Sequence, residues 1–410
     1  MVRANGAKHS LQRPSPPDHP AAWNDGVLRV CLVDPSLFTA PYDRALMGGL
    51  RAIGDEVRLY TCSATGLDAP GWHGDVIQHF YRPSANKPRR LPAPLLRWRK
   101  GLDHAASMRR LVGELMAWRP SVIHFQWTPL PILDRWFLQD LRAIAPTVCS
   151  VHDTAPFNGS PSSWLQKIGA LEILAKFDAV VVHTDYAYER LKDPNLRIKD
   201  ICKIPHGLLE GAAADTPCRT AFPSASVSIL AFGKIKSYKG LDVLLHALSL
   251  LSPEDRARCR VKVVGKPYMN TSLLTRLAGS LGVNDIVEFD FRYVEDDEIS
   301  GLFQRASVVV LPYRKIDASG VLFTAIASGC PVIASRIGGF AETLSDGRDA
   351  ILVPPNDPHA LALALHRVIQ DCSLRSRLAE GIRSLRDKTL SWVEIGHLTH
   401  RLYERAGARQ

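Results

Sequence analysis

Long apolar runs are missing from this chain of 410 residues. No segment approaches the roughly 18 to 20 consecutive apolar residues that a membrane-spanning helix needs, so we expect no membrane span. Residues 1–26 contain basic side chains without an apolar core behind them, which is unlike a secretory signal. We therefore expect this N-terminal stretch to be a disordered tail.

Paired cysteines and the common phosphate-binding glycine motifs are missing too. The eight cysteines form no CxxC pair, and Cys31, Cys149 and Cys330 fall in or beside expected buried strands. Reduced thiols of a cytoplasmic protein explain this pattern better than a metal site or a disulfide framework. The absence of GxGxxG after either first strand disfavours a dinucleotide-binding oxidoreductase. The absence of GxxxxGK followed by Ser or Thr disfavours a P-loop nucleotidase.

The composition is that of a globular protein with two domains. Hydrophobic residues make up 46% and charged residues 22% of the chain, and its length exceeds what one compact core usually holds. Small and polar residues from 210 to 223 suit a linker. We expect a first domain over residues 27–212, a second over 213–388, and a C-terminal helix over 389–410 that packs back on the first domain.

Positive charge is concentrated in one segment. The net charge is +10, and residues 82–110 hold nine cations against one acid, Asp103. Apolar residues such as Leu95, Trp98 and Leu102 lie among these charges, as they do in helices at a membrane interface. A solvated surface helix and a peripheral contact with anionic lipid, or with the phosphate of a lipid-linked acceptor, both remain open. Nucleic acid is disfavoured because no recognition motif accompanies the charge.

Short apolar runs alternate with helical patterns along the chain, which predicts an α/β fold. In the first half we expect strands at 27–33, 56–62, 121–126, 147–152, 179–183 and 203–204. In the second half we expect them at 228–232, 261–264, 286–289, 308–311, 331–334 and 349–353. Further helices are expected at 358–370 and 390–406. This pattern is typical of two doubly wound, Rossmann-like domains that face each other across a cleft.

The stretch from Ala306 to Phe340 contains a strand, a loop, a helix and a second strand. The helix is expected to begin at Ser319 and Gly320, at the carboxyl edge of a parallel sheet, where open α/β sheets bind ligands. Its free backbone N–H groups and its positive dipole end suit a phosphate. The plainer alternative is that Ser319 is only an N-cap and Gly320 only a packing glycine.

Three lysines lie in one loop at the head of the second half. Lys234, Lys236 and Lys239 fall between a strand end and a helix start. Lysines this close repel one another unless an anion lies among them, and a diphosphate is the small-molecule anion that best fits such a loop. A solvated, charged turn is the alternative.

These residues belong to a longer pattern that resembles the retaining family 4 glycosyltransferases of GT-B fold. The resemblance runs from about Val27 to the C-terminus. It rests on SVHDTAP, VVVHTDYAYERL and IPHG in the first half, and on LAFGKIKSYKGLDVLLHAL, VVGKP and SGVLFTAIASGCPVIASRIGGFAE in the second. It implies an enzyme that moves a sugar from a nucleotide-diphosphate donor to a glycan or lipid-linked acceptor in bacterial polysaccharide or glycolipid synthesis. It implies no metal and no other cofactor. Together with the basic segment at 82–110, it leads us to expect a cytoplasmic protein with a candidate peripheral contact at the inner face of the cell membrane.

The resemblance also implies roles for individual residues. Lys234 and Lys239 would hold the donor diphosphate, whereas it fixes no role for Lys236. His152 would lie near the transferred sugar; alternatively it is a buried strand-end histidine bonded to Asp153. The other donor-side candidates are Ser319, Gly320, Val321, Tyr293 and Gly265, and the acceptor-side candidates are Tyr42 and Asp153. We expect His183 and His206 to be structural.

One departure from the family concerns its pair of glutamates, spaced as E-x7-E around the phosphate-binding helix. Ile316 and Thr324 occupy those two positions here. Thr324 could still bond a ribose hydroxyl, though more weakly than a carboxylate does, and Asp317 could replace the first glutamate. The departure leaves open a non-catalytic GT-B protein that binds a nucleotide sugar or a partner. A hydrolase or epimerase that acts on the nucleotide sugar is a third reading.

Overall fold

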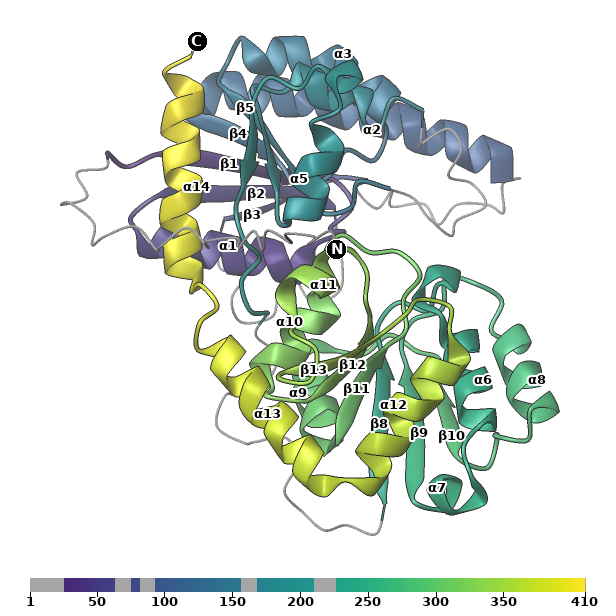
Figure 1. Cartoon of the computed structure of the whole chain (residues 1–410). Coiled ribbons are helices and arrows are strands. Elements are labelled where there is room, and N and C mark those ends of the chain that lie inside the picture. Colours follow the sequence, from purple (N-terminus) through teal and green to yellow (C-terminus); the bar gives the residue numbers. More distant parts are fainter. Residues whose placement is uncertain (1–25, 63–74, 82–92, 156–167, 210–225, 410) are drawn as a thin grey trace, which may run out of the picture.

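The computed structural model describes residues 26–62, 75–81, 93–155, 168–209 and 226–409. Most of the expected tail, the whole expected linker at 210–223 and residues 82–92 of the basic segment lie outside this range. Figure 1 shows an N-terminal half above a C-terminal half, each with a central sheet and helices on both of its faces.

The first sheet has seven parallel strands in the order β3-β2-β1-β4-β5-β6-β7. They are β1 Arg29–Asp34, β2 Glu56–Cys62, β3 Val76–Phe80, β4 Val122–Phe125, β5 Thr147–Val151, β6 Ala179–Val182 and β7 Ile201–Lys203. The main helices are α1 Ala40–Ala52, α2 Ala93–Trp118, α3 Pro131–Arg142 and α5 Asp185–Leu191. The central strands β4, β5 and β6 are buried throughout, because helices cover both faces of the sheet.

The second sheet has six parallel strands in the order β10-β9-β8-β11-β12-β13. They are β8 Val227–Phe232, β9 Cys259–Val264, β10 Val287–Asp290, β11 Val308–Leu311, β12 Val332–Ser335 and β13 Ala350–Val353. The helices are α6 Leu241–Ser249, α7 Pro253–Ala257, α8 Ser272–Ser280, α9 Asp296–Arg305, α10 Gly320–Ala327, α11 Gly338–Thr343, α12 Pro358–Gln370 and α13 Cys372–Arg386. The predicted α/β architecture of two doubly wound halves is confirmed.

The strand order reverses once in each sheet, between β1 and β4 and between β8 and β11. Ligands of open α/β sheets bind outside the carboxyl ends of the strands at such a switch point. The loops that follow these four strands are therefore the segments in which a site is expected.

The last helix, α14 (Trp392–Gly407), returns to the N-terminal half and packs against α1. The helix backbones come very close, since a Cβ atom on Gly49 would lie 2.0 Å from the carbonyl oxygen of Trp392. The buried side chain of Tyr403 fills the core beneath α1, and its hydroxyl lies 2.7 Å from Nδ1 of His124. His400 lies 3.0 Å from Asp55 in the same core.

Three carboxylates connect the two halves directly. Glu342 of α11 accepts hydrogen bonds from the backbone N–H groups of Asp185 and Tyr186, at the start of α5. Asp317 accepts one from the backbone N–H of Thr154, and Asp296 pairs with Arg44 at 3.0 Å. The carboxyl edges of the two sheets therefore face each other. None of the helices in the described residues combines the length and apolar character that a membrane crossing requires.

Candidate active site

The three-lysine loop lies directly against the loop that follows β11. The backbone N–H of Arg314 donates to the carbonyl oxygen of Tyr238 at 2.7 Å. A Cβ atom on Gly240 would lie 1.9 Å from the carbonyl oxygen of Pro312, so the two backbones touch. The fold thus brings the lysines next to the segment that leads into α10.

Lys239 is a buried cation whose acceptors are uncharged. Its ammonium donates to the Tyr313 hydroxyl at 2.7 Å and to the carbonyl oxygen of Phe232 at 3.4 Å. The residue is only 7% exposed. Burial lowers the pKa of Lys239 to about 7, because a buried ammonium loses hydration that these acceptors do not replace.

The Lys239 ammonium and the first turn of α10 meet beside Gly233. A Cβ atom on Gly233 would lie 2.7 Å from Nζ of Lys239 and 3.0 Å from Cγ2 of Val321, so a larger residue would fill the space between them. Gly233 also has a φ of +108°, which side chains disfavour. Ser319 is the N-cap residue of α10, but its side chain makes no capping hydrogen bond to the backbone N–H groups of the first turn.

Gly265 lies at the same sheet edge, just after β9. A Cβ atom on Gly265 would lie 2.0 Å from the carbonyl oxygen of Gly233. The structure therefore brings Lys239, Gly265 and Val321 together around Gly233, with Ser319 and Gly320 next to Val321 in the chain.

The other two lysines of the loop point across to the N-terminal half. Nζ of Lys234 lies 4.1 Å from the ring centre of Phe38 and donates to its carbonyl oxygen at 3.5 Å. Burial lowers the pKa of Lys234 to about 8, and the charges of Lys236 and Lys239 add to the effect. Burial also lowers the pKa of Lys236, which the nearby charge of Asp153 opposes.

His152 lies at the carboxyl end of β5, on the N-terminal side of this space. Its Nε2 lies 3.4 Å from Oε1 of Gln126, and its ring meets Tyr42 edge-on with 4.7 Å between centroids. Burial lowers the pKa of His152 well below its ordinary value, and His183 and two further histidines act in the same direction. The imidazole is therefore neutral near pH 7, able to exchange hydrogen bonds but not to act as a cation.

Asp153 and Asp317 approach each other from the two halves. Asp153 accepts a hydrogen bond from the backbone N–H of Ala155 at 2.8 Å, instead of bonding His152. The pKa of Asp153 is raised to about 7, mainly by burial and also by the charge of Asp317, against the hydrogen bond from Ala155 and the charge of Lys236. The two carboxyl groups line one pocket between the halves, together with Tyr238.

The remaining predicted residues lie around this centre. Thr324 is buried one turn into α10, where its hydroxyl donates to the carbonyl oxygen of Gly320 at 3.0 Å. Tyr293 is 55% exposed at the rim. His206 stacks on Phe323 of α10 at 4.2 Å, and Nδ1 of His183 lies 2.9 Å from the carbonyl oxygen of Ile204.

Five residues of this region were not singled out from the sequence, namely Phe38, Trp127, Gly233, Tyr313 and Glu342. Gly233 had a usable signal, because a glycine just after a strand end marks a close backbone approach. The other four act through contacts with segments distant in sequence, which no local pattern reveals.

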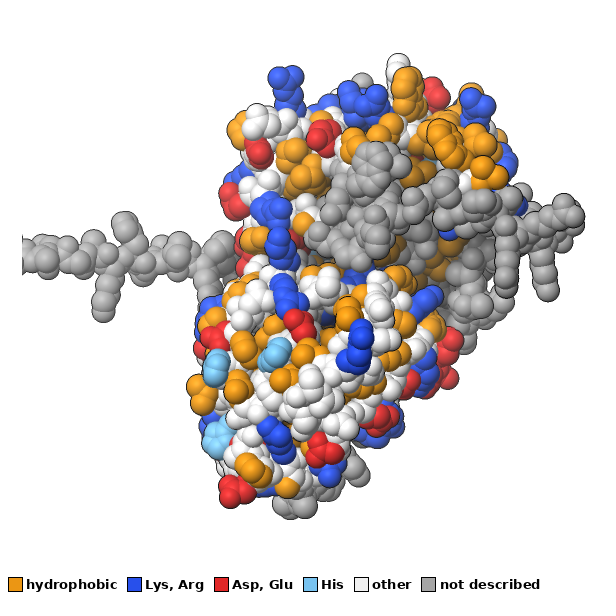
Figure 2. Space-filling view, turned by 90° about the vertical axis from the view of Figure 1, so that its right-hand side faces the viewer, with side chains coloured by type: hydrophobic (Ala, Val, Ile, Leu, Met, Phe, Trp, Pro, Cys, Tyr) orange, Lys and Arg blue, Asp and Glu red, His pale blue; other side chains and the backbone are white. Residues whose placement is uncertain are grey.

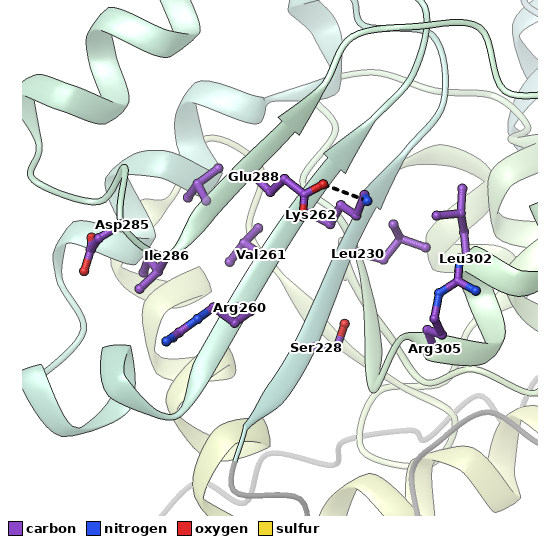
Figure 3. A pocket seen from close by; sticks show the side chains of 11 residues that line it. Ser228, Leu230, Arg260, Val261, Lys262, Asp285, Ile286, Glu288, Leu302 and Arg305 are labelled. Atoms are coloured by element: carbon purple, nitrogen blue, oxygen red, sulfur yellow. Dashed lines mark ion pairs between the residues drawn. The ribbon is translucent and has the colours of Figure 1, made fainter.

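A second hollow lies on the other side of the C-terminal half. Figure 3 shows it against β8, β9 and β10, with the ion pair between Lys262 and Glu288 at 2.7 Å across two strands. Its lining includes Ser228 and Leu230, toward the amino end of β8. It therefore lies away from the carboxyl edge and the lysine loop. Within the described residues no group of three or more His, Cys, Asp or Glu side chains is arranged to hold a metal ion.

Two family models match this chain. The model for glycosyl transferases group 1 matches residues 226–371, and that for the glycosyl transferase 4-like domain matches residues 39–207. Together they cover more than half of the chain, and each matches one of the two halves that the structure contains.

The two curated relatives below have the same description. A D-inositol 3-phosphate glycosyltransferase of Streptomyces bingchenggensis is 27% identical over 96% of this chain and 87% of its own length. One of Thermobifida fusca is 34% identical over 44% of this chain and 43% of its own length.

Solved structures share the fold. Sucrose-phosphate synthase from Thermosynechococcus elongatus superimposes with a TM-score of 0.70 at 20% identity, over 93% of this chain and 100% of the other. Anabaena HepE in complex with UDP and glucose gives 0.70 at 17% identity, over 92% and 100%. These likenesses confirm the predicted GT-B arrangement.

Proposed function

We propose that this enzyme, which belongs to the group 1 glycosyltransferases, transfers a sugar from a nucleotide-diphosphate donor with retention of configuration. The single observation that carries the proposal is the convergence of the Lys239 ammonium and the first turn of α10 beside Gly233. A diphosphate in that space would meet a cation on one side and a helix N-terminus on the other.

Cleavage of the donor builds negative charge on the leaving phosphate. Lys234, Lys239 and the backbone N–H groups of the first turn of α10 would stabilise that charge, in place of a divalent cation. Because Lys239 is already desolvated, its interaction with the phosphate is stronger than it would be in water. The phosphate charge would raise the pKa of Lys239 again, so that the lysine is fully charged in the complex.

The transferred sugar would lie between His152 and Asp317. The neutral imidazole can form a hydrogen bond with a sugar hydroxyl. Asp317 is one position along the chain from the place of the family's first glutamate. Gly265, Thr324 and Tyr293 would line the nucleoside side of the donor. In this scheme the acceptor hydroxyl attacks from the face on which the nucleotide leaves, near Tyr42 and Asp153.

The chemistry of similar proteins guides the choice of substrates. HepE structures hold UDP, glucose and UDP-glucose, which supports UDP-sugars as first donors to test. The Streptomyces relative is named for D-inositol 3-phosphate, which supports testing that acceptor beside glycans and lipid-linked sugars. We propose a role in bacterial polysaccharide or glycolipid synthesis.

The test combines donor binding with turnover. A thermal-shift screen with UDP, GDP, ADP and their sugars should reveal one preferred nucleotide, because binding to the folded state alone raises apparent stability. The variant Lys239→Met should lose at least about 100-fold in transfer rate, as expected when a charge-stabilising group is removed. The control is Lys262→Met, a partly exposed lysine in the ion pair with Glu288. Unchanged transfer by Lys239→Met, or an equal loss in the control, would contradict the proposal.

We also propose peripheral contact with anionic lipid through α2, at the inner face of the cell membrane. Met108, Leu111 and Leu115 are buried in the core on one face of α2. Nearer the amino end of α2, on a different side of the helix, Trp98 is 75% and Leu102 is 71% exposed, a pattern that suits a membrane interface. Figure 2 shows hydrophobic side chains gathered among Lys and Arg on the upper half of the molecule.

Flotation with vesicles that contain anionic phospholipid tests this contact. The double variant Trp98→Ser, Leu102→Ser should float less than the wild type, because both interfacial anchors are removed. Leu363→Ser on α12 is the matched control, since that leucine is 67% exposed in the other half. Equal flotation of all three proteins would count against α2 as the contact.

A further inference from the structure

We propose that Tyr313 is a positioning residue, whose hydroxyl holds the Lys239 ammonium toward the space beside Gly233. The inference rests on the function proposed above, because it concerns the lysine to which the donor diphosphate is assigned there. The hydroxyl oxygen lies 2.7 Å from Nζ of Lys239. Tyr313 is only 2% exposed, so this hydrogen bond is shielded from bulk water, which would weaken it.

The Lys239 ammonium has one hydrogen more than it has acceptors in the protein. An ammonium carries three hydrogens and accepts none. Within the described residues it donates one to the Tyr313 hydroxyl and one to the carbonyl oxygen of Phe232 at 3.4 Å. An added Cβ atom on Gly233 would lie 2.7 Å from Nζ, so open space begins there. The two protein acceptors therefore restrict the direction of the ammonium and leave its third hydrogen for a ligand.

The position of Tyr313 is fixed by the fold before any ligand binds. Its two neighbours in the chain both contact the lysine loop. The carbonyl oxygen of Pro312 lies against Gly240, and the backbone N–H of Arg314 donates to the carbonyl oxygen of Tyr238 at 2.7 Å. The ring of Tyr313 packs against an aromatic ring of α11, with 5.2 Å between centroids. The hydroxyl is thus a preorganised acceptor for the ammonium.

The same hydroxyl reaches the start of α10. Burial raises the pKa of Tyr313, and a hydrogen bond with the side chain of Ser319, the N-cap residue of α10, opposes this. The hydroxyl is therefore neutral near pH 7, and a neutral hydroxyl can accept one hydrogen bond while it takes part in another. Tyr313 accordingly joins the two groups assigned to the donor diphosphate, which are the Lys239 ammonium and the N-terminal end of α10.

Removal of this hydroxyl has a definite effect on Lys239. The charged form loses one of its two acceptors, so the pKa of Lys239 should fall below its value of about 7. A hydrogen bond to a charged group contributes on the order of one pKa unit. Among the described residues, the charges that act on Lys239 come from Lys234 and Lys236 of the same loop, and removal of the hydroxyl leaves both in place.

A pH titration by NMR tests this inference directly, with ¹³C at the ε carbon of lysine and the Lys239 signal assigned by its absence from Lys239→Met. Tyr313→Phe keeps the ring and removes only the hydroxyl. Lys239 should titrate at least about one pH unit lower in this variant than in the wild type. The control is Tyr188→Phe, which changes another tyrosine beside a lysine, since its ring centre lies 4.5 Å from Nζ of Lys192. The control should leave the titration of Lys239 unchanged.

Calorimetry with UDP then measures the effect at the proposed donor site. A diphosphate binds the charged form of Lys239, so a lower pKa weakens binding most where the free lysine is neutral. For a decrease of one unit, the dissociation constant of Tyr313→Phe should exceed that of the wild type about tenfold at pH 8 and only about twofold at pH 6. The ratio of the two constants cancels the titration of UDP itself and of Lys234. A residue that served only packing would give the same ratio at both pH values.

The outcomes separate this inference from the function on which it rests. Equal titration of Lys239 in the wild type and Tyr313→Phe would overturn the inference, as would an equal ratio of UDP dissociation constants at both pH values. The same changes in Tyr188→Phe would also overturn it. If the wild type binds neither UDP nor another nucleoside diphosphate, the proposed function fails, while the NMR titration still decides whether Tyr313 holds Lys239 in its charged form.

Discussion

Replacement of Lys239 by methionine should make the ligand-free protein more stable while it abolishes donor binding. The ammonium is 7% exposed, and its two acceptors, the Tyr313 hydroxyl and the Phe232 carbonyl, carry no charge. Methionine fills a similar volume without a charge to desolvate. On the proposed function, the wild-type lysine serves its ligand at the expense of stability.

The magnitude follows from the pKa. The pKa of Lys239 is lowered from 10.5 to about 7 by burial, so the folded state binds fewer protons than the unfolded state between these values. Stability therefore rises with pH in this window, and the cost of the buried lysine falls from about 4 kcal/mol at pH 7 to about 1 kcal/mol at pH 10. Loss of the two hydrogen bonds offsets about 1 to 2 kcal/mol of the gain.

Thermal unfolding of both proteins at pH 7 and pH 10 measures the effect. Lys239→Met should melt roughly 4 to 10 °C higher than the wild type at pH 7, and the difference should disappear at pH 10. UDP should raise the midpoint of the wild type but not that of the variant. A variant that melts lower than the wild type at pH 7, or a difference that is the same at both pH values, would refute the reasoning.

Three further predictions concern the cleft. Gly233→Ala should weaken UDP binding at least about tenfold in calorimetry, because its Cβ atom would lie 2.7 Å from Nζ of Lys239. Unchanged affinity would show that the diphosphate does not bind in the space beside Gly233. In the wild type, the dissociation constant for UDP should rise at least roughly fivefold from pH 8 to pH 9, as Lys234 with its pKa of about 8 loses its proton. A flat profile would exclude Lys234 from the donor contact. Glu342→Gln should speed hydrogen exchange of the Asp185 amide, because it weakens the hydrogen bond from this amide to residue 342 across the two halves. The control is Glu380→Gln, which changes an exposed glutamate. Equal exchange in both variants would contradict the prediction.

The sequence predicted the central elements of both sheets well, because their strands are buried on both faces and read as unbroken apolar runs. β2, β11 and α12 coincide with their predicted bounds. Four elements were missed, namely β3, the short helices α7 and α11, and α13. β3 is an edge strand with the polar residues Gln78 and His79 in its interior, and α13 contains Gly381, which weakens a helical pattern.

The grouping of the candidate donor residues could also be predicted, since Lys234, Lys239 and Gly320 lie in loops that a parallel sheet must bring to one edge. The structure places Lys239 beside the first turn of α10, and the role of these residues as donor contacts stays a prediction. Phe38, Trp127, Tyr313 and Glu342 could not be predicted, because each acts through a partner in a distant segment. The same holds for the depressed pKa of Lys239, which depends on how deeply the fold buries a side chain that the sequence shows only as a cation.

The return of α14 has a consequence for synthesis of the protein on the ribosome. Tyr403 and Ile395 occupy the core of the half that is translated first, yet they are translated after the whole C-terminal half. Domains generally fold as units while the chain emerges, at about 5 to 20 residues per second. The C-terminal half can therefore close its own core before the N-terminal half is complete, and the N-terminal half stays incomplete until α14 has been translated. Truncation before Trp392 should leave that half with an open core and make it a target for chaperones and proteases.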